Sequence, residues 1–160
     1  AFEYLVRKYH RPIYHLCLGF TGAHQSADDL SQDTFIKAFF SLGRFDADRG
    51  FYAWIRKIAV NSSLNYIKKK KREKPLDTDH PNSSVSNSPS EQLQWKRFHA
   101  KFHDAFHTLP EEQKSVFILR TYENLSYEEI ADILEIPPGT VMSRLSRARN
   151  KLKSEMAEYL

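Results

Sequence analysis

The stretch LSYEEIADILEIPPGTVMSRLSRARNKLK, residues 125–153, decides the fold, because it predicts two short helices joined by a tight turn. Ser126 is expected to cap the first helix, and Glu129, three residues later, completes a capping box. Two prolines and a glycine at 137–139 are expected to end this helix, since proline lacks an amide hydrogen and glycine permits a tight turn.

The second helix is expected to start near Thr140, and its sequence separates apolar from basic residues. Apolar residues recur at spacings of four, three and four, which places them in one inward stripe: Val141, Leu145, Ala148 and Leu152. Five basic residues and no carboxylate occur from Thr140 to Lys153. This pattern is typical of a helix-turn-helix whose second helix enters the DNA major groove. A helical hairpin with a solvated basic face is the alternative.

Composition places the chain among folded proteins. It has 160 residues, of which 41% are hydrophobic, so one or two domains can form. The formal charge of +4 is small, and its distribution is therefore more informative than its size. Cys17 is the single cysteine, which excludes an intramolecular disulfide, fits a reducing compartment and predicts a core position. No apolar run is long enough to span a bilayer, so we expect a cytoplasmic protein without direct membrane insertion.

The first part of the chain predicts two further helices. The helix from Phe2 to Phe20 is expected to kink at Pro12, or to begin near it. Ser26 is expected to cap the next helix, which continues as far as Phe45. The apolar residues of that helix cover more than one side, and Asp29, Gln32 and Asp33 edge them. This excess of apolar surface predicts contact with a partner protein. The alternative is that two neighbouring helices of the same chain cover the apolar surface.

The segment GFYAWIRKIAVNSSLNYIKKKKR, residues 50–72, is expected to form a helix that mixes aromatic residues with amides and bases. Such a mixture suits single-stranded nucleic acid, since rings stack on bases, amides read their edges and cations neutralise phosphates. A core helix with a solvated polar side is the alternative, and for Trp54 we expect it. The run Lys68 to Arg72 follows a phosphate backbone or is simply solvated.

Residues 75–92 read as a flexible linker, because prolines and serines dominate them. The sequence thus predicts an all-α protein of two small helical domains, 1–74 and 93–160, the second containing the helix-turn-helix. A helix from Leu93 to His107 is expected to bury Phe98, Phe102 and Phe106. It also carries a histidine stripe, His99, His103 and His107, that spreads over roughly 12 Å. One ion cannot bridge that distance, so no metal site is expected, and no cofactor or catalytic residue either.

Three segments in order resemble the extracytoplasmic-function sigma factors of bacterial RNA polymerase, and the resemblance covers nearly the whole chain. DDLSQDTFIKAF, residues 28–39, is similar to the family's polymerase-binding helix. FYAWIRKIAVNSSLNYIKKKKR, residues 51–72, looks like its promoter-melting and minus-ten-reading helix. Residues 109–152 look like its minus-thirty-five domain. The resemblance implies a non-enzymatic sigma factor that binds core polymerase and reads both promoter elements.

The resemblance also implies roles for individual residues. Docking on the polymerase's largest subunits is expected of Asp29, Leu30, Gln32, Asp33, Phe35 and Ile36. Binding of the minus-ten element is expected of Phe45, Asp46, Arg49, Phe51, Asn61, Asn65, Lys68 and Lys69. Binding of the minus-thirty-five element is expected of Thr140, Met142, Ser143, Arg144, Ser146, Arg147 and Arg149. Two departures are Asn65, where the family often has aspartate, and Met142, where a basic residue is common.

The partners implied by the resemblance are core RNA polymerase, promoter DNA and an anti-sigma factor, membrane-anchored, that covers the polymerase-facing and DNA-facing surfaces. Two other functions compete with this interpretation. An ordinary helix-turn-helix regulator would bind duplex DNA as a dimer and ignore the polymerase. A metal sensor would use the histidine stripe.

Overall fold

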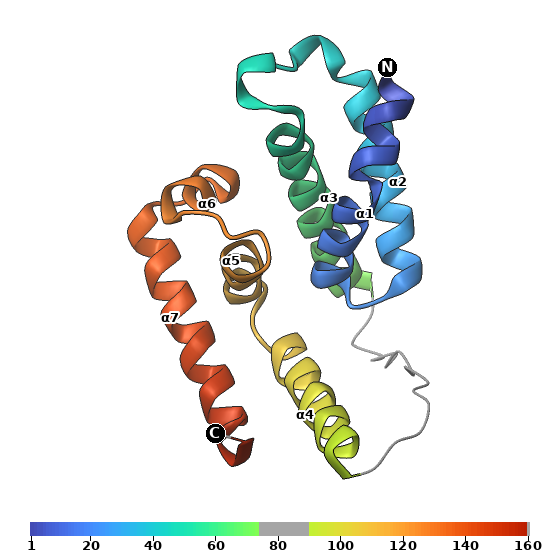
Figure 1. Cartoon of the computed structure of the whole chain (residues 1–160). Coiled ribbons are helices and arrows are strands. Elements are labelled where there is room, and N and C mark those ends of the chain that lie inside the picture. Colours follow the sequence, from blue (N-terminus) through green and yellow to red (C-terminus); the bar gives the residue numbers. More distant parts are fainter. Residues whose placement is uncertain (74–89, 160) are drawn as a thin grey trace. The chain divides into compact units, whose positions relative to one another are not determined.

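The structure, a computed structural model, describes residues 1–73 and 90–159, and most of the predicted linker lies outside them. The chain divides into two compact units, and within the described residues every regular element is a helix (Figure 1). The N-terminal unit holds α1 (Phe2–Thr21), α2 (His24–Phe40) and α3 (Phe51–Glu73). The C-terminal unit holds α4 (Ser90–His107), α5 (Glu111–Thr121), α6 (Tyr127–Leu134) and α7 (Pro138–Glu155). Both units confirm the predicted all-α class.

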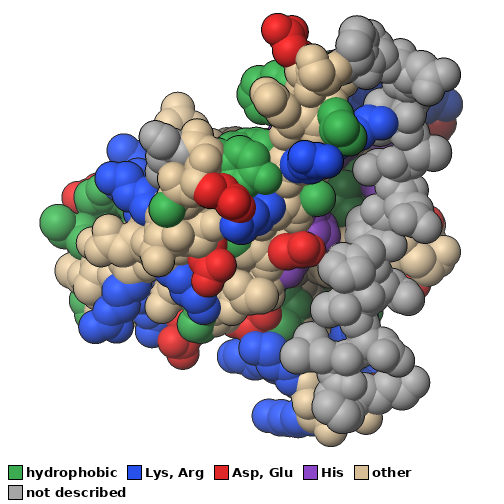
Figure 2. Space-filling view, turned by 90° about the horizontal axis from the view of Figure 1, so that it is seen from below, with side chains coloured by type: hydrophobic (Ala, Val, Ile, Leu, Met, Phe, Trp, Pro, Cys, Tyr) green, Lys and Arg blue, Asp and Glu red, His purple; other side chains and the backbone are tan. Residues whose placement is uncertain are grey.

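Charges of both signs are interspersed on one face of the molecule. In the face shown in Figure 2, basic and acidic side chains lie next to one another and do not form one field. A net charge of +4 on 160 residues is consistent with this mixture. On this face, local groups of side chains rather than the net charge therefore decide where a charged partner can bind.

The three helices of the N-terminal unit pack around one core. Ile13, Cys17, Ile55, Ala59 and Val60 are completely inaccessible to solvent there. Burial raises the pKa of the Cys17 thiol to about 11, because the charged thiolate would lose its hydration. The thiol is therefore neutral and a core group, as the sequence predicted.

The first two helices of the N-terminal unit each decide one expectation about where a helix starts. α1 does not begin near Pro12 but continues through it, and Pro12 lies on the exposed side while Ile13 and Leu16 are buried. Ser26 does not cap α2: the cap is Ala23, and the Ser26 hydroxyl lies 2.7 Å from the hydroxyl of Tyr66. The turn falls earlier because Gly22, with φ 69°, adopts the left-handed conformation that ends α1.

A turn of two short 3-10 helices follows α2, which ends at Phe40 rather than at Phe45. These helices are η1 (Leu42–Arg44) and η2 (Ala47–Arg49). Asp46 caps η2 by accepting a hydrogen bond from the Asp48 backbone N–H at 3.0 Å. Gly50, with φ 75°, then turns the chain into α3 in a conformation that few other residues adopt.

The helix-turn-helix forms as predicted at its capping box. The Glu129 backbone N–H donates to Ser126 Oγ at 3.1 Å, and the Ser126 backbone N–H donates to Glu129 Oε1 at 3.3 Å. Left-handed residues stand on both sides of α6, Asn124 with φ 53° and Glu135 with φ 56°.

The turn between the two helices of this motif differs from the prediction. Glu135, and not Gly139, takes the left-handed turn conformation. Pro138 is the first residue of α7, so the prolines start the second helix instead of ending the first. Its fixed φ suits the first helical position, where no amide hydrogen is needed.

Aromatic rings connect the first helix of the C-terminal unit to its neighbours. The Phe98 and Phe102 ring centroids lie 6.3 Å apart, and those of Phe102 and Phe106 6.1 Å apart. Phe117 of α5 lies 5.8 Å from Phe106. Ser90 to Gln92, which the sequence assigned to the linker, already belong to the first turn of α4.

Candidate protein and nucleic-acid interfaces

The apolar residues of α2 divide between the core and the surface. Leu30 and Phe35 are buried, whereas Ile36 is 56% and Phe40 is 82% exposed. A helix turns about 100° per residue, so positions 30 and 35 face α1 and α3 while 29, 32, 36 and 40 face outward. The prediction that Leu30 and Phe35 lie on the docking surface is therefore wrong, because both support it from inside.

Polar side chains edge the exposed side of α2. Asp29 and Gln32 are exposed, and Asp33 pairs with Lys37 at 2.8 Å. Gln32 Nε2 donates to Asp28 Oδ2 at 3.1 Å. Exposed pairs of this kind contribute little stability, so these groups can exchange their intrahelical partners for those of another protein.

Sequence reasoning left two residues of this face out of the predicted site. Phe39 and Phe40 are both exposed, with ring centroids 5.6 Å apart, and Phe39 also contacts the Phe2 ring at 5.3 Å. The sequence did contain a signal for these two residues. α2 has more apolar residues than one buried side needs, and Phe39 and Phe40 are among them. The exposed face of α2 is defined here as Asp29, Gln32, Asp33, Ile36, Phe39 and Phe40.

A cluster of aromatic rings supports the turn between α2 and α3. The Phe45 ring lies 5.8 Å from Phe51 and 5.1 Å from Trp54. Phe51 in turn lies 5.5 Å from Tyr9 of α1. The sequence predicted that Phe51 lies open to a base. Phe51 is instead buried, and it supports the turn from below. Trp54 is half-buried and contacts both phenylalanines of the cluster.

The predicted minus-ten residues occupy two levels of the N-terminal unit. Phe45, Asp46 and Arg49 lie in the turn, whereas Asn61, Asn65, Lys68 and Lys69 are exposed along α3. A rise of 1.5 Å per residue separates Phe51 from Lys68 by roughly 26 Å along the helix axis. The two groups can therefore contact one strand of several nucleotides but not a single base.

The second helix of the helix-turn-helix presents its predicted residues on the surface. Its stripe of Val141, Leu145, Ala148 and Leu152 is buried, and Met142 is 54% exposed. Ser143, Ser146, Arg147 and Arg149 are exposed as well, while Thr140 and Arg144 are partly exposed. Helical geometry puts Ser143, Ser146 and Arg147 opposite the stripe, with Arg144 and Arg149 on the two flanks. The exposed side of α7 is therefore polar and basic, and it lies opposite the buried apolar stripe.

The histidine stripe of α4 does not gather into a metal site. Within residues 1–73 and 90–159 no group of three potential ligands is present. The His103 and His107 rings lie 4.2 Å apart, while His99 stacks on Trp95 at 5.5 Å. Burial lowers the pKa of His107 to about 4, and the positive charges of Lys114 and His103 act in the same direction.

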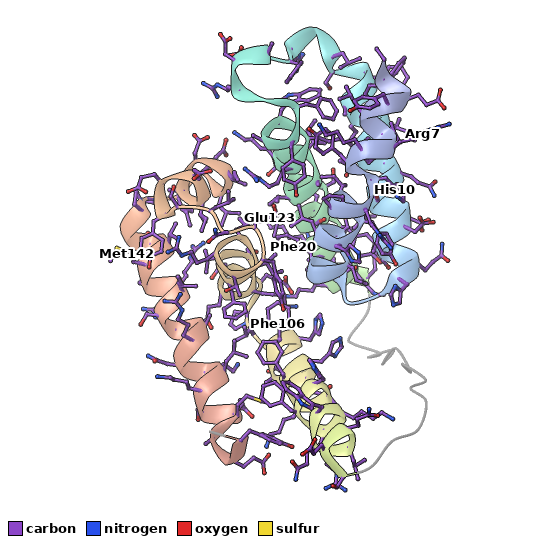
Figure 3. All side chains as sticks on the ribbon, viewed as in Figure 1. Arg7, His10, Phe20, Phe106, Glu123 and Met142 are labelled. Carbon is purple, nitrogen blue, oxygen red and sulfur yellow. The ribbon has the colours of Figure 1, made fainter. Side chains whose placement is uncertain are left out.

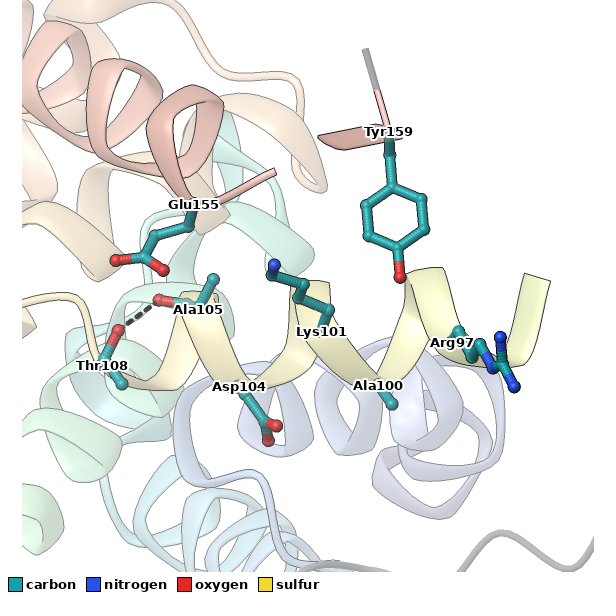
Figure 4. Close-up of a pocket in the computed structure, with 8 residues that line it drawn as sticks. All are labelled: Arg97, Ala100, Lys101, Asp104, Ala105, Thr108, Glu155 and Tyr159. Atoms are coloured by element: carbon teal, nitrogen blue, oxygen red, sulfur yellow. Dashed lines mark hydrogen bonds between the residues drawn. The ribbon is translucent and has the colours of Figure 1, made fainter. Parts of the chain in front are cut away.

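A groove lies in the C-terminal unit beside α4, with Arg97 and Lys101 among its lining residues (Figure 4). Glu155 of α7 and Tyr159 of the final turn η3 (Ala157–Tyr159) close its other side. The Lys101 ammonium forms a salt bridge with Glu158, and Tyr159 packs 5.5 Å from the Phe98 ring. These contacts hold the C-terminal turn against α4.

No helix in the described part of the chain is long and apolar enough to cross a membrane.

Family models match both units. The family described as sigma-70 region 2 matches residues 5–73, and the one described as sigma-70, region 4 matches residues 99–152. The RNA polymerase sigma-H factor of Pseudomonas aeruginosa is 34% identical over all of this chain and 88% of its own length. The ECF RNA polymerase sigma-E factor of Haemophilus influenzae is 33% identical over 98% of this chain and 87% of its own.

Solved structures agree with these matches. The sigma factor RpoE of Bartonella quintana, in complex with the anti-sigma factor NepR, is 26% identical with a TM-score of 0.74, covering 98% of this chain and 96% of that one. CnrH, in complex with the cytosolic domain of CnrY, is 25% identical with a TM-score of 0.69, covering 98% and 88%. The chain therefore belongs to the extracytoplasmic-function sigma factors of the sigma-70 family, the specificity factors that direct core RNA polymerase to initiate transcription at promoters.

Proposed function

We propose that this sigma factor divides polymerase binding and promoter recognition among three separate surfaces, one for core polymerase and two for promoter DNA. The observation that carries the proposal is the presence, in one chain, of an exposed apolar face on α2 and a basic helix-turn-helix surface on α7. A regulator that bound only duplex DNA would need the second surface but not the first. The exposed face of α2 docks on the largest subunits of core polymerase.

The turn between α2 and α3 and the outer side of α3 hold the melted minus-ten element. Phe45 offers a half-buried ring supported by Phe51 and Trp54, next to the polar groups of Asp46 and Arg49. Asn61 and Asn65 contact the strand further along, and Lys68 and Lys69 neutralise its phosphates. Each stacking contact is worth on the order of 1–3 kcal/mol, and capture of unstacked bases drives DNA opening without any bond being made or broken.

The exposed side of α7 reads the minus-thirty-five element in the major groove. Ser143, Ser146 and Arg147 face base edges beside Met142, and Thr140, Arg144 and Arg149 contact the phosphate backbone. Met142 contributes an apolar contact, because its thioether offers no strong donor to a base.

An anti-sigma factor controls access to these surfaces. The support is that two structurally similar proteins are each solved in complex with a partner: the sigma factor RpoE with the anti-sigma factor NepR, and CnrH with the cytosolic domain of CnrY. We infer a partner of the same kind for this chain, anchored in the membrane, that covers the exposed face of α2 and the DNA-facing side of α7. The sigma factor itself acts in the cytoplasm.

Run-off transcription with purified core polymerase tests the proposal. A pool of promoter fragments is transcribed with and without the chain, and start sites are mapped. We expect specific start sites only when the chain is present, with a shared sequence motif upstream of them. Tight binding to duplex DNA without initiation would contradict the proposal and favour an ordinary helix-turn-helix regulator.

A further inference from the structure

The first turns of α7 place an apolar side chain among polar ones on the surface that we propose to face DNA. Met142 is 54% exposed, and the next residue, Ser143, is exposed as well. Figure 3 shows Met142 projecting from α7 on the side away from α5. Residues near the start of a recognition helix are the ones that reach base edges. The chemistry of Met142 therefore affects which base pair this helix accepts.

Helical geometry puts Met142 on a flank of this surface rather than at its centre. At 100° per residue, Met142 lies about 90° from the direction opposite the buried stripe, and Arg149, two turns later, lies on the same flank. In the major groove, the outer edges of a base pair are the purine N7 and the pyrimidine C5 position, with the amino and carbonyl groups between them. A side chain on the flank of α7 is therefore placed to meet one of the two outer edges.

The thioether of Met142 distinguishes between these outer edges. The purine N7 is a hydrogen-bond acceptor, and methionine has no donor to offer it. The C5 methyl group of thymine is apolar, and its contact with a methionine side chain removes apolar surface of both groups from water. Cytosine has no methyl group at C5, so the same contact is lost there. The apolar side chain therefore favours thymine over the three other bases.

Two neighbouring residues fit the same kind of base pair and the close approach it requires. Ser143 Oγ donates to the backbone carbonyl of Thr140 at 3.1 Å, so its proton is used within the helix and its lone pairs remain to accept. An acceptor suits the amino group of the adenine that pairs with thymine. Gly139, one turn before Met142, is exposed, and a Cβ added there would contact no described residue beyond its neighbours in the helix. The side of α7 around Met142 is thus open to DNA.

We propose that Met142 makes this sigma factor selective for thymine at one position of the minus-thirty-five element, through contact between its side chain and the C5 methyl group in the major groove. The inference deepens the proposed function and rests on it, because α7 must first lie in the groove. A methionine that packed on deoxyribose instead would bind every sequence alike, and the test distinguishes these two contacts.

The test uses holoenzyme reconstituted from core polymerase and the full chain, on closed duplexes of the upstream element found by run-off transcription. Each thymine of the element is replaced in turn by deoxyuridine, which removes only the methyl group, and dissociation constants are measured. With the wild type, deoxyuridine at one position should weaken binding roughly three- to fivefold, which corresponds to one buried methyl group. Met142→Ala should abolish this difference, and Met142→Leu should retain most of it, because leucine keeps an apolar side chain.

A second probe adds the methyl group to a base that lacks it. Cytosine paired with guanine is placed at the sensitive position and compared with 5-methylcytosine paired in the same way. The wild type should bind the methylated duplex roughly three- to fivefold more tightly, and Met142→Ala should bind both duplexes alike. This comparison isolates the methyl group from every hydrogen bond of the base pair.

Arg149→Ala is the matched control on the same flank of α7. Loss of a phosphate contact weakens binding to all sequences about equally, so the ratio between thymine and deoxyuridine duplexes should stay that of the wild type. The inference is overturned if no thymine of the element shows a methyl effect that Met142→Ala removes. Failure of the proposed function is a separate result, since Arg147→Ala would then leave the affinity for the upstream element unchanged as well.

Discussion

The two ends of this molecule that we propose as binding regions, α7 and the end of the N-terminal unit around the turn between α2 and α3, distribute apolar residues between core and surface in different ways. On α7 the buried side is apolar and the outer side is polar and basic, so each residue type has one role. At the end of the N-terminal unit, aromatic residues are both core and surface: Phe51 is buried, Phe45 is half-buried and Phe40 is 82% exposed. Reading a closed duplex requires only polar side chains on a rigid helix. Holding an unstacked base or another protein requires exposed apolar side chains. Hydrophobicity therefore marks the core in one region and both core and interface in the other.

A core substitution should produce the largest effect and shows whether the two units are independent. Leu145 is 1% exposed, and Leu145→Ala should destabilise the C-terminal unit by about 2–5 kcal/mol through lost burial and a cavity. Urea unfolding followed by Trp54 fluorescence, with Trp95→Phe as background, reports the N-terminal unit. We expect its midpoint to stay unchanged while helical circular dichroism is lost earlier. A shift of both transitions together would contradict a division into independent units.

Substitutions on the two surfaces should affect different partners. Arg147→Ala should weaken binding to the upstream duplex element by roughly 1–3 kcal/mol, because it removes a base-edge contact, and should leave core-polymerase affinity unchanged. Asp33→Ala combined with Ile36→Ala should do the reverse. Phe35 is unsuitable for this test, because it is buried and its loss would disturb folding. Fluorescence anisotropy with labelled DNA and with labelled core measures both affinities, and equal losses in either variant would disprove the division of tasks.

Acidic pH should destabilise the C-terminal unit through His107. Its pKa is lowered from 6.5 to about 4 by burial first and by Lys114 and His103 next, so the folded state keeps the ring neutral. Between these two values the unfolded chain binds a proton that the folded unit does not, and stability falls as the pH falls. We expect a loss of about 1–2 kcal/mol from pH 7 to pH 5, since partial exposure of the ring screens the effect.

Urea unfolding at the two pH values, followed by Trp95 fluorescence with Trp54→Phe as background, measures this loss. His107→Leu should remove most of the pH dependence, and His99→Leu is the control, because His99 is exposed on the same helix. An unchanged pH dependence in His107→Leu would show that other groups cause it.

Two serines with similar sequence signals should respond differently to substitution. Ser126→Ala should cost about 1 kcal/mol of stability, and Ser126→Asp should retain most of it, because aspartate also caps helices. Ser26→Ala should cost about 0.5–1.5 kcal/mol through the hydrogen bond with Tyr66, and Tyr66→Phe should cost a similar amount, because either change removes one hydroxyl of the pair. Thermal unfolding of the four variants compares them. If Tyr66→Phe were as stable as the wild type, the hydroxyl pair would be unimportant.

The sequence predicted the helix-turn-helix well because its signals are local. The capping box involves residues three apart, and the apolar stripe of α7 repeats within one helix. Ser26 carried a comparable signal, but Gly22 ended α1 earlier and placed Ser26 inside α2. A capping residue is thus informative only where the preceding turn leaves it at the helix start.

The site residues of the N-terminal unit were harder to predict, for a physical reason. Leu30, Phe35 and Phe51 were expected at interfaces because they belong to segments that resemble binding segments, yet all three are buried. Which side of α2 is covered depends on α1 and α3, and neighbouring residues of α2 do not contain that information. Phe39 and Phe40 illustrate the converse, since only the packed structure shows that they are left uncovered.

The left-handed residues on both sides of α6 have a consequence for folding cooperativity. α6 has eight residues, fewer than an isolated helix needs in water. Asn124 before it and Glu135 after it take the left-handed conformation, which residues other than glycine rarely adopt. Such a helix has no native-like state apart from α5 and α7. Its amides should therefore exchange with solvent only when the whole C-terminal unit opens, and α7 cannot lose its support through local fraying alone.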